Sequence, residues 1–461
     1  MAAGSSQTDA LVVFGATGDL AFRKIYPALQ ALVERSVLSI PVIGMARGGN
    51  TLDDLRQRVI DSLQEHGRPD VESVPALTRL LGYVDGDYSD PATFARLREA
   101  LGPSQAPLYY LAIPPGMFAT VIRHLHAAGC TAGNARVVVE KPFGRDLPSA
   151  RELNRILHET FDEGAVFRID HFLGKEPVQN LTYFRFANRF LEPVWNRQHV
   201  ASVQVTMAEQ IGVEGRGRFY EEVGAMRDVV QNHLLEVIAQ VAMEPPAAAD
   251  ADGLRDAKAE LLKRIRPLSP GNLVRGQYRG YREEDGVAPD SGVETFAAVR
   301  LAIDSDRWRG VPFFIRAGKR LPTTVTEVTV ELQRPEPVFA SEPIASPNYF
   351  RFRLGPDRIA IAVGARSKKP GSVMVGEPVE LMVCDDGRDH MSAYERLIGD
   401  AMKGDHTLFA RADAVEQAWS VVAPVLDCGV PVHPYAPDSW GPEAADALTA
   451  ERGGWLCPSC E

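Results

Sequence analysis

The chain has 461 residues, of which 45% are hydrophobic and 24% are charged, a mixture typical of a folded protein with two or three domains and unlike that of a small module or a disordered chain. Lysine and arginine together number 50 against 61 for aspartate and glutamate, which gives a formal net charge of −11. Such a chain repels polyanions, so nucleic acid is not expected as a partner, whereas a few local cations can still bind a phosphorylated small molecule.

The sequence also indicates a cellular compartment. No run approaches the roughly 18 uninterrupted apolar residues that span a bilayer, and residues 1–9 lack the apolar core of a signal peptide. The five cysteines are few, odd in number and mostly scattered, as in proteins of reducing compartments. We therefore expect a cytoplasmic protein without membrane contact.

The first 175 residues alternate short apolar runs with longer stretches of helical spacing. Near-continuous apolar runs are typical of parallel strands that are buried on both faces. Strands are expected at 10–14, 40–46, 107–113 and 135–140, and helices at 115–129 and 148–161. This rhythm predicts a Rossmann-type, doubly wound sheet in a dinucleotide-binding domain over residues 1–175.

A glycine-interrupted turn follows the first strand and precedes a helix. Glycine there lets the chain bend, so that free backbone N–H groups and the helix dipole can bind a pyrophosphate. The spacing is GxxGxxA, which is also compatible with a simple tight connection, but its position at the first strand-helix junction favours a coenzyme site. Pro27 inside the following helix predicts a kink. The candidate coenzyme-binding residues of the turn are Gly15, Thr17, Gly18, Asp19 and Leu20.

The end of the second strand favours NADP over NAD, although NAD stays possible. No aspartate or glutamate is placed there to bind a ribose 2′-hydroxyl, whereas Arg47 could pair with a 2′-phosphate. The alternative for Arg47, and equally for Lys24, is a solvated surface cation.

Residues 167–176 concentrate charged and titratable groups where the first domain ends. In an extended segment, Asp170 and His171 would point to opposite sides. In a helical turn, His171 and Lys175, four residues apart, would converge on one anion.

After residue 176 the rhythm changes to alternating runs without a helix between each pair. Strands are expected at 200–207, 293–303, 325–332 and 359–363. Helices are expected at 222–243, 256–265, 392–402 and 412–422, and loops at 245–250 and 334–347. The pattern predicts a larger second domain over residues 176–461, with a mostly antiparallel sheet covered by helices.

The helix expected at 222–243 carries two polar residues of interest, Asp228 and His233. On an ideal α-helix these two residues lie about 140° apart, so their spacing does not aim both at one substrate. A histidine at the edge of an apolar stripe is more often part of a core than a catalyst.

The motifs occur together in the order typical of one family. The glycine turn is followed by Glu140-Lys-Pro-Phe-Gly, the Asp170-His-x-Leu-Gly-Lys-Glu signature, Gln231-Asn-His-Leu-Leu and Ile315-Arg-Ala-Gly-Lys-Arg. From about residue 10 to Trp455 the chain resembles the glucose-6-phosphate dehydrogenase family. The resemblance implies oxidation of C1 of glucose 6-phosphate to 6-phosphogluconolactone with hydride transfer to NADP, and a homodimer or homotetramer.

The resemblance also implies roles for single residues. His233 matches the general base and Asp170 its partner. Lys24 matches a coenzyme contact, Lys141 matches a residue near both coenzyme and sugar, and Pro142 is expected to be cis. The residues that match substrate contacts are His171, Lys175, Glu209, Asp228, Lys319 and Lys141. The residues alone would suggest surface ion pairs for Lys141 and Lys319.

Two positions depart from the family pattern. Phe172 stands where tyrosine is usual, and Thr324 stands where a second lysine usually follows Lys319. A lost charge-assisted hydrogen bond costs on the order of 1.5–3 kcal/mol, so weaker phosphate binding is expected unless Arg320 or another cation compensates.

Two further interpretations concern metal and function class. Cys457 and Cys460 would supply only half of a tetrahedral zinc site, so no metal is expected and a thiol tail without function is favoured. The alternative is intermolecular zinc binding or redox pairing across a dimer. One alternative function is a two-domain oxidoreductase acting on another sugar or sugar phosphate; an enzyme for an unphosphorylated sugar or polyol would not require His171 with Lys175. The other is a non-catalytic NADP-binding sensor, which would not require His233 with Asp170.

Overall fold

The computed structural model describes residues 7–68, 72–336, 346–356, 359–385 and 391–458. The chain forms two compact units. The first unit contains residues up to Gly174 together with 248–255 and 391–416, and the second contains the remainder. The boundary predicted from the sequence lies one residue later, and residues 248–255 and 391–416 were both expected in the second domain. The apolar face of an amphipathic helix can pack against either core, so the sequence pattern could not assign these segments to the correct domain.

The sheet of the first unit has six parallel strands in the order β3-β2-β1-β4-β5-β6. This is the strand order of dinucleotide-binding folds, in which ligands bind at the carboxyl ends of the strands where the order reverses, here between β1 and β4. The predicted Rossmann-type sheet is therefore confirmed. The strands are β1 (Ala10–Phe14), β2 (Val42–Ala46), β3 (Leu81–Asp85), β4 (Pro107–Leu111), β5 (Arg136–Glu140) and β6 (Val166–Ile169).

Helices of the first unit start at recognisable caps. Thr51 caps α2 (Leu52–His66), Asp146 caps α6 (Leu147–His158) and Ser392 caps α11 (Ala393–Lys403), each in a capping box. The other helices of this unit are α1 (Tyr26–Glu34), α3 (Ser73–Leu80), α4 (Pro91–Leu101) and α5 (Phe118–Ala127).

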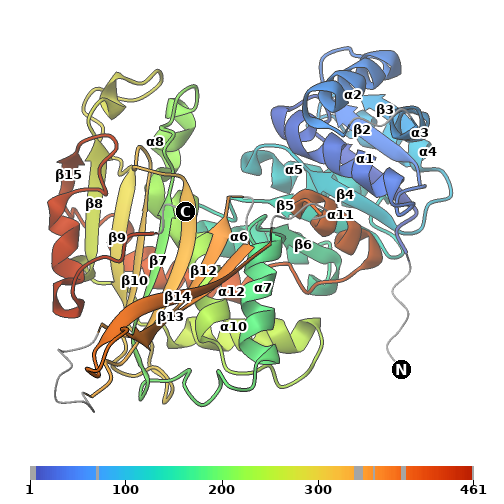
Figure 1. Ribbon diagram of the computed structural model, residues 1–461. Coiled ribbons are helices and arrows are strands. Elements are labelled where there is room, and N and C mark those ends of the chain that lie inside the picture. Colours follow the sequence, from blue (N-terminus) through green and yellow to red (C-terminus); the bar gives the residue numbers. More distant parts are fainter. Residues whose placement is uncertain (1–6, 69–71, 337–345, 357–358, 386–390, 459–461) are drawn as a thin grey trace. The chain divides into compact units, whose positions relative to one another are not determined.

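The late helix α11 belongs to the core of the first unit. Its residues Leu397, Ile398 and Met402 share one buried apolar cluster with Leu29 and Leu32 of α1. Figure 1 shows α11, in red, beside the blue and teal elements of this unit. Burial of such side chains stabilises by roughly 1.5–3 kcal/mol each, which explains why this part of the chain returns to the first unit.

The sheet of the second unit has nine strands in the order β14-β13-β12-β11-β7-β10-β9-β8-β15. Neighbouring strands pair antiparallel except for β7 with β10 and β8 with β15, which confirms the predicted mostly antiparallel sheet. The strands are β7 (Val200–Ala208), β8 (Leu273–Tyr278), β9 (Phe296–Leu301), β10 (Phe313–Gly318), β11 (Val325–Leu332), β12 (Tyr349–Gly355), β13 (Ile359–Lys368), β14 (Gly376–Asp385) and β15 (Val432–Tyr435).

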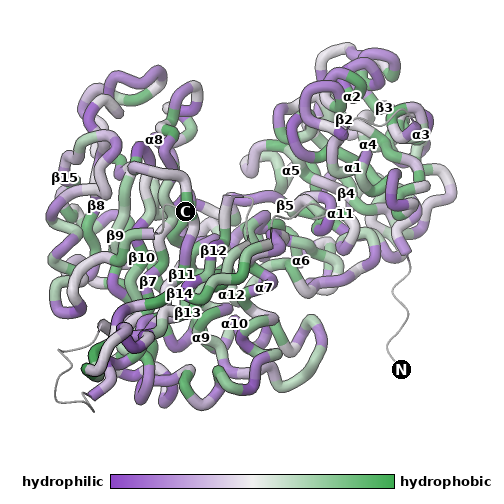
Figure 2. The backbone as a smooth tube through the Cα atoms, in the orientation of Figure 1, coloured by the Kyte–Doolittle hydropathy of each residue, from purple (hydrophilic) through white to green (hydrophobic). Residues whose placement is uncertain are grey.

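The central strand and the edge strand of this sheet differ in burial. The central strand β7 is buried along its whole length. On the edge strand β14, in contrast, Leu381 and Val383 are 66% and 75% exposed, and the chain is coloured as hydrophobic there in Figure 2. The sheet therefore ends in an apolar edge.

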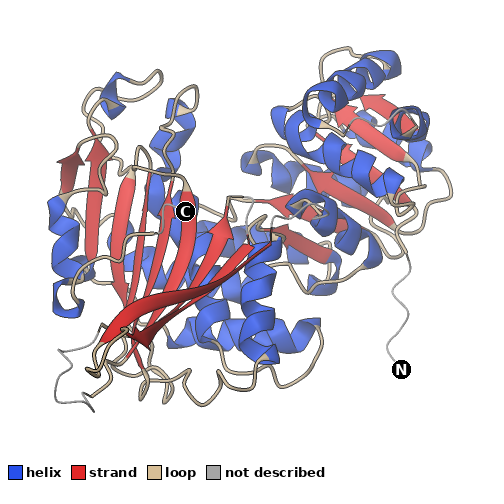
Figure 3. Cartoon of the chain, in the orientation of Figure 1, coloured by secondary structure: helices blue, strands red, loops and turns tan. Residues whose placement is uncertain are grey.

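Helices cover the second sheet, as Figure 3 shows. Helix α7 (Glu176–Ala187) contacts β12 and β13, and the segment η4 (Met226–Leu234) contacts β10. The helices α10 (Ala251–Arg264) and α12 (Ala412–Leu426) each begin in the first unit and end in the second. Within the described part of the chain, no helix combines the length and apolar character required to cross a membrane.

The single helix expected at 222–243 is wrong. Three segments replace it: α8 (Gly217–Ala225), the π-helix η4, and α9 (Leu235–Ala242). The break falls at Gly224, whose φ of 59° and ψ of 175° are not helical. Of the expected loops, 245–250 is irregular, whereas 337–345 lies outside the described residues.

Candidate active site

The turn after β1 requires glycine at its first position. Gly15 has φ +78°, and a Cβ there would lie 2.1 Å from the carbonyl oxygen of Ala112, so another residue would be strained and would collide with backbone. The Gly15 N–H contacts the Met45 carbonyl at 2.9 Å and the Tyr88 hydroxyl at 2.8 Å. These contacts tie the turn to β2.

The same turn leaves donors for a ligand. Within the described residues, the backbone N–H groups of Thr17 and Asp19 receive no hydrogen-bond acceptor. They lie at the start of a helix, where unpaired N–H groups and the helix dipole favour a phosphate. The turn therefore presents two backbone donors of the kind that bind a pyrophosphate, and the coenzyme role of its residues stays a prediction.

The helix after the turn begins with a π segment, η1 (Ala21–Ile25), and continues directly as α1. Pro27 lies in the first turn of α1, where its missing N–H costs little, so the expected kink is replaced by this widened turn. The Tyr26 hydroxyl donates to the carbonyl of Ala16, and this hydrogen bond fixes the glycine turn to α1. Lys24 is exposed within η1.

Arg47 follows β2 directly and is exposed. Gly48 and Gly49 next to it have left-handed φ values, and the Gly49 N–H donates to Asp85 at the end of β3 over 3.0 Å. No acidic residue occurs between Val42 and Asn50. The loop therefore presents a cation, and no carboxylate of its own, at the end of β2.

Glu140, the last residue of β5, is buried beside Lys141. Its carboxylate accepts a hydrogen bond from the Tyr110 hydroxyl at 2.5 Å. Burial raises the pKa of Glu140 to about 7, against the opposing effects of the Tyr110 hydrogen bond and the Lys141 charge. The Lys141–Pro142 peptide is cis, which confirms the family-based expectation for Pro142.

The segment after β6 folds as tight turns. Asp170 is 1% exposed, and its Oδ1 accepts from the Phe172 N–H at 2.9 Å. Leu173 N–H donates to the Asp170 carbonyl and Gly174 N–H to the His171 carbonyl. Lys175 is extended, with φ −74° and ψ 132°, so the helical turn that would relate His171 to Lys175 does not form.

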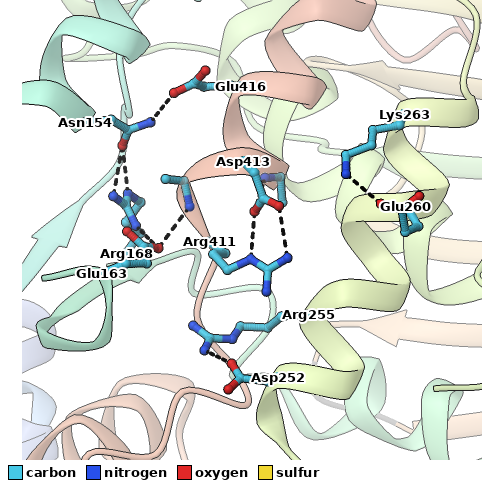
Figure 4. A network of polar contacts seen from close by, with 12 residues as sticks. Asn154, Glu163, Arg168, Asp252, Arg255, Glu260, Lys263, Arg411, Asp413 and Glu416 are labelled. Carbon is cyan, nitrogen blue, oxygen red and sulfur yellow. Dashed lines mark hydrogen bonds and ion pairs between the residues drawn. The ribbon is translucent and has the colours of Figure 1, made fainter. Parts of the chain in front are cut away.

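A buried network fixes the strand that leads to Asp170 (Figure 4). Arg168 is completely buried and donates to Asn154 at 2.9 Å and to Glu163 at 2.7 Å. Asn154 in turn donates to Glu416 at 2.9 Å, and the Ala412 N–H donates to Glu163 at 3.0 Å. The returning segment 391–416 thus helps to hold β6 in place.

A compact charged cluster lies in the second unit, at the ends of β7 and β10. The Lys319 ammonium donates to Glu209 and lies 3.8 Å from Asp228. It also lies 5.7 Å from the centroid of the Tyr220 ring, a cation–π distance. Burial, followed by the charge of Asp228, raises the pKa of Tyr220 well above its usual value. Lys319 is only 8% exposed, so the surface ion pair considered for it is wrong.

The π-helix η4 changes the expected relation of Asp228 and His233. In a π-helix the hydrogen bonds run from i to i+5, so residues five apart lie about one turn apart on the same side. Asp228 and His233 are five apart and both lie within η4. The 140° separation derived from an ideal α-helix is therefore wrong for this segment. His233 is 2% exposed.

Glu294 caps the N-terminal end of η4. Its carboxylate accepts from the Met226 N–H at 3.1 Å, and its carbonyl accepts from the Ala225 N–H at 2.9 Å. Arg275 donates to the same carboxylate at 2.7 Å. A Cβ on Gly224 would lie 2.6 Å from this carboxylate, so the capping requires glycine in the break before η4.

The structure shows the surroundings of Phe172 and Thr324, the two positions that depart from the family pattern. Phe172 is buried at 5% exposure. Thr324 is exposed, and its hydroxyl accepts from the Gln210 N–H at 3.1 Å. Arg320, the cation that could compensate for a missing lysine, is paired with Glu214.

The predicted site residues therefore form two groups. The first unit holds the coenzyme turn with Gly15, Thr17, Gly18, Asp19 and Leu20, and also Lys24, Arg47, Lys141, Asp170 and His171. The second unit holds Lys175, Glu209, Asp228, His233 and Lys319. Within the second group, Glu209, Asp228 and Lys319 are in contact.

Sequence reasoning missed the residues that orient these groups. Folding, and no sequence motif, brings four such residues into hydrogen bonds with the site segments: Tyr26, Tyr88, Tyr110 and Glu294. Glu140 belongs to the recognised Glu140-Lys-Pro-Phe-Gly motif, but no role was predicted for it. Its position at the end of an expected strand was the signal that could have pointed to the site. Cys457 is exposed, and Cys460 lies outside the described residues.

Comparison with known proteins covers nearly the whole chain. Residues 12–180 match the model of the glucose-6-phosphate dehydrogenase NAD binding domain, and residues 182–456 match that of the glucose-6-phosphate dehydrogenase C-terminal domain. The chain is 43% identical to glucose-6-phosphate 1-dehydrogenase 1 of Mycobacterium tuberculosis, over 99% of this chain and 97% of that protein.

Solved structures agree with this result. The crystal structure of glucose-6-phosphate 1-dehydrogenase from Mycobacterium avium has a TM-score of 0.92 and 45% identity, covering 99% of this chain and 100% of that one. A glucose-6-phosphate dehydrogenase in complex with its substrate glucose-6-phosphate has a TM-score of 0.91 and 34% identity, with the same coverage. The chain therefore belongs to the glucose-6-phosphate dehydrogenase family.

Proposed function

We propose that this protein oxidises C1 of glucose 6-phosphate to 6-phosphogluconolactone with NADP as hydride acceptor, which is the first step of the pentose phosphate pathway. The observation that carries the proposal is the full-length likeness, at 34% identity and a TM-score of 0.91, to a dehydrogenase solved with glucose 6-phosphate. The charged cluster of Glu209, Asp228 and Lys319 supplies groups suited to a sugar phosphate.

The residues of the first unit fit NADP. Gly15 creates a space that a Cβ would fill, and Thr17 and Asp19 present N–H groups to a pyrophosphate. Arg47 would pair with the 2′-phosphate, while Gly18, Leu20, Lys24 and Lys141 would complete the surroundings. NADP, when bound, supplies the acceptor for the hydride that leaves C1.

His233 would act as the general base. It would accept the proton of the C1 hydroxyl as the C1–H bond breaks and the C1=O bond forms. Imidazole is suited to this task because its ordinary pKa lies near neutral pH, so much of it is unprotonated. Asp170 would orient the imidazole and stabilise its protonated form, as carboxylates do beside catalytic histidines.

The remaining residues would bind the substrate. His171 and Lys175 would bind the phosphate, since both can donate hydrogen bonds to its oxygens. Glu209 and Asp228 would accept from sugar hydroxyls, and Lys319 would donate. The contacts that these three make with one another keep the side chains oriented before substrate arrives, which lowers the ordering cost of binding.

A direct assay tests the proposal. Reduced nicotinamide absorbance would be followed with glucose 6-phosphate or glucose, each with NADP or NAD. We expect the highest kcat/KM with glucose 6-phosphate and NADP. Equal kcat/KM on glucose would support an oxidoreductase for another sugar, and absence of turnover with every pair would support a non-catalytic NADP-binding protein.

We further propose a homodimer, or a homotetramer built from it, joined through the exposed edge of the second sheet. The apolar residues Leu381, Met382 and Val383 of β14 are exposed, and such a patch on an edge strand is typical of an interface. Sedimentation velocity of the wild type should give a dimer or larger. Val383→Glu should shift it to monomer, and an unchanged mass would contradict this interface.

We also propose that the protein works in the cytoplasm. One relative, glucose-6-phosphate 1-dehydrogenase 6 of Arabidopsis thaliana, is named cytoplasmic and is 38% identical over 97% of this chain and 91% of its own length. Cys130, Cys384, Cys428 and Cys457 are unpaired thiols in the described residues. Cell fractionation with detection of the native protein would test this.

A further inference from the structure

Tyr394 stacks on the imidazole of His171. It lies in the first turn of α11, in the segment that returns late to the first unit. Its ring is nearly parallel to that of His171, with an interplanar angle of 10° and a centroid distance of 6.3 Å. This is the range of an offset stack, which opposes rotation of the imidazole out of the parallel orientation.

The hydroxyl of Tyr394 lies beside a buried carboxylate. Burial, followed by the charge of Glu140, raises the pKa of this hydroxyl well above its usual value. The Glu140 carboxylate accepts a hydrogen bond from the Tyr110 hydroxyl at 2.5 Å. Glu140 is buried at the end of β5. Tyr394 of α11 is thus placed next to a buried carboxylate at the end of β5 that is itself bound to β4, so its hydroxyl lies in a polar environment largely withdrawn from water.

Helix α11 is itself held against the segment that carries His171. A Cβ on Gly174 would lie 2.8 Å from the Leu397 side chain and 2.9 Å from the Ala393 carbonyl, so the two segments touch closely. At the other side of α11, Glu395 is fully buried and pairs with Arg35 at 2.5 Å. The position of Tyr394 is therefore set by contacts on both sides of its helix.

We propose that Tyr394 is a positioning residue that holds the His171 imidazole ready for the phosphate of the substrate. The inference rests on the proposed function and adds to it a residue from a distant part of the sequence. Tyr394 acts through His171 and needs no contact with the sugar. Its loss should weaken binding of phosphorylated substrate and leave the chemistry at C1 unchanged.

Two variants separate the ring from its hydroxyl. Tyr394→Leu removes both the stacked ring and the hydroxyl, and Tyr394→Phe removes only the hydroxyl. For Tyr394→Leu we expect KM for glucose 6-phosphate to rise about tenfold, with kcat within about twofold of wild type and kcat/KM for glucose unchanged. Tyr394→Phe should raise KM by about two- to threefold. Tyr183→Leu is the matched control, because Tyr183 is 74% exposed in the second unit.

A double-mutant cycle makes the test specific. In a His171→Ala background, Tyr394→Phe and Tyr394→Leu should add no further increase in KM, because the group through which Tyr394 acts is absent. An additive effect would overturn the proposal, and so would an equal loss of kcat/KM on glucose and on glucose 6-phosphate. If Tyr394→Leu does not fold, the same comparison with Tyr394→Phe decides.

The wild type separates this proposal from the proposed function. A wild type without preference for the phosphorylated sugar would overturn the proposed function and the role of Tyr394 together. A wild type that prefers glucose 6-phosphate, with Tyr394 variants that keep its KM unchanged, would overturn only the role of Tyr394.

Discussion

The two units offer their candidate ligand-binding groups in different ways. In the first unit the candidate coenzyme turn presents backbone N–H groups at the carboxyl end of a parallel strand, and it depends on the absence of a side chain at Gly15. In the second unit the groups are charged side chains that are largely withdrawn from solvent, such as Lys319 with Glu209 and Asp228. Changes of shape should therefore damage the first unit most, and changes of charge the second.

The two units also share a feature. Each has a π segment beside its candidate binding groups, η1 after the glycine turn and η4 around His233. A π segment inserts one extra residue into a turn and so changes which side chains share a face. Such segments are rare and occur frequently at functional sites.

The largest effect is expected in the second unit. His233→Asn should lower kcat by about 10²–10⁴-fold, because it removes the proposed acceptor of the C1 hydroxyl proton, while KM for NADP should stay close to wild type. Absorbance of reduced nicotinamide measures both. A variant with full turnover would remove His233 from the reaction and with it the assignment of the chemistry to the second unit.

In the first unit, Gly15→Ala should be the most damaging change. The added Cβ would meet the Ala112 carbonyl and force a left-handed alanine, at a cost of about 1–3 kcal/mol for the backbone conformation alone. Affinity for NADP, measured by calorimetric titration, should fall on the order of a hundredfold. Gly164→Ala is the control, since nothing lies within 4 Å of its Cβ position. Equal affinities of the two variants would contradict a backbone-built coenzyme site.

Glu140 should make the stability of the first unit depend on pH. Its pKa is raised by burial from 4.5 to about 7, so the folded protein binds the proton more tightly than the unfolded chain does. The stabilisation is therefore complete below pH 4.5 and is lost as the pH rises to about 7, by about 3 kcal/mol. Urea unfolding should show that Glu140→Gln flattens this decline. A parallel decline in variant and wild type would contradict the assignment.

Arg47→Ala should change coenzyme preference without affecting the sugar. Loss of a charge-assisted contact to the 2′-phosphate, worth on the order of 1.5–3 kcal/mol, should raise KM for NADP by roughly ten- to a hundredfold and leave KM for NAD unchanged. Arg23→Ala, in the same unit, serves as the control. An equal increase for both coenzymes would place Arg47 away from the 2′-phosphate.

The smallest effect concerns charge in the second unit. Thr324→Lys should lower KM for glucose 6-phosphate several-fold, because Arg320 is already paired with Glu214 and the added ammonium would supply a further charge-assisted contact to the phosphate. Thr323→Lys tests whether any added charge suffices. An unchanged KM for Thr324→Lys would count against the interpretation of this protein as a weaker phosphate binder.

The parallel sheet could be predicted from sequence because its strands are buried on both faces, so each run is apolar throughout. The coenzyme turn was visible because Gly15 must be glycine. The π-helix was not visible, since Val223, Met226 and Val230 repeat at spacings that an α-helix also explains. The hydrogen-bond pattern of η4 depends on a break at Gly224 and a cap from Glu294, seventy residues further along the chain, and no local pattern records such a partner.

The sequence indicated which residues belong to the candidate site, but it did not indicate how all of them are arranged in space. The candidate residues for catalysis and phosphate binding were recognised as motifs, and the structure shows Lys319 in contact with Glu209 and Asp228. Tyr394 belongs to no motif near His171 and lies more than two hundred residues away from it. Its role became visible only because the chain returns to the first unit.

That return has a consequence for how the protein is made. The Rossmann sheet leaves the ribosome early, yet Leu397, Ile398 and Phe409, which complete its apolar core, follow only after residues 175–390 have been synthesised. At about 5–20 residues per second this takes roughly 10–50 s. During this time the nascent domain exposes the apolar surface that α11 later covers. Chaperone occupancy on stalled nascent chains should therefore persist past residue 174 and end only once α11 has emerged.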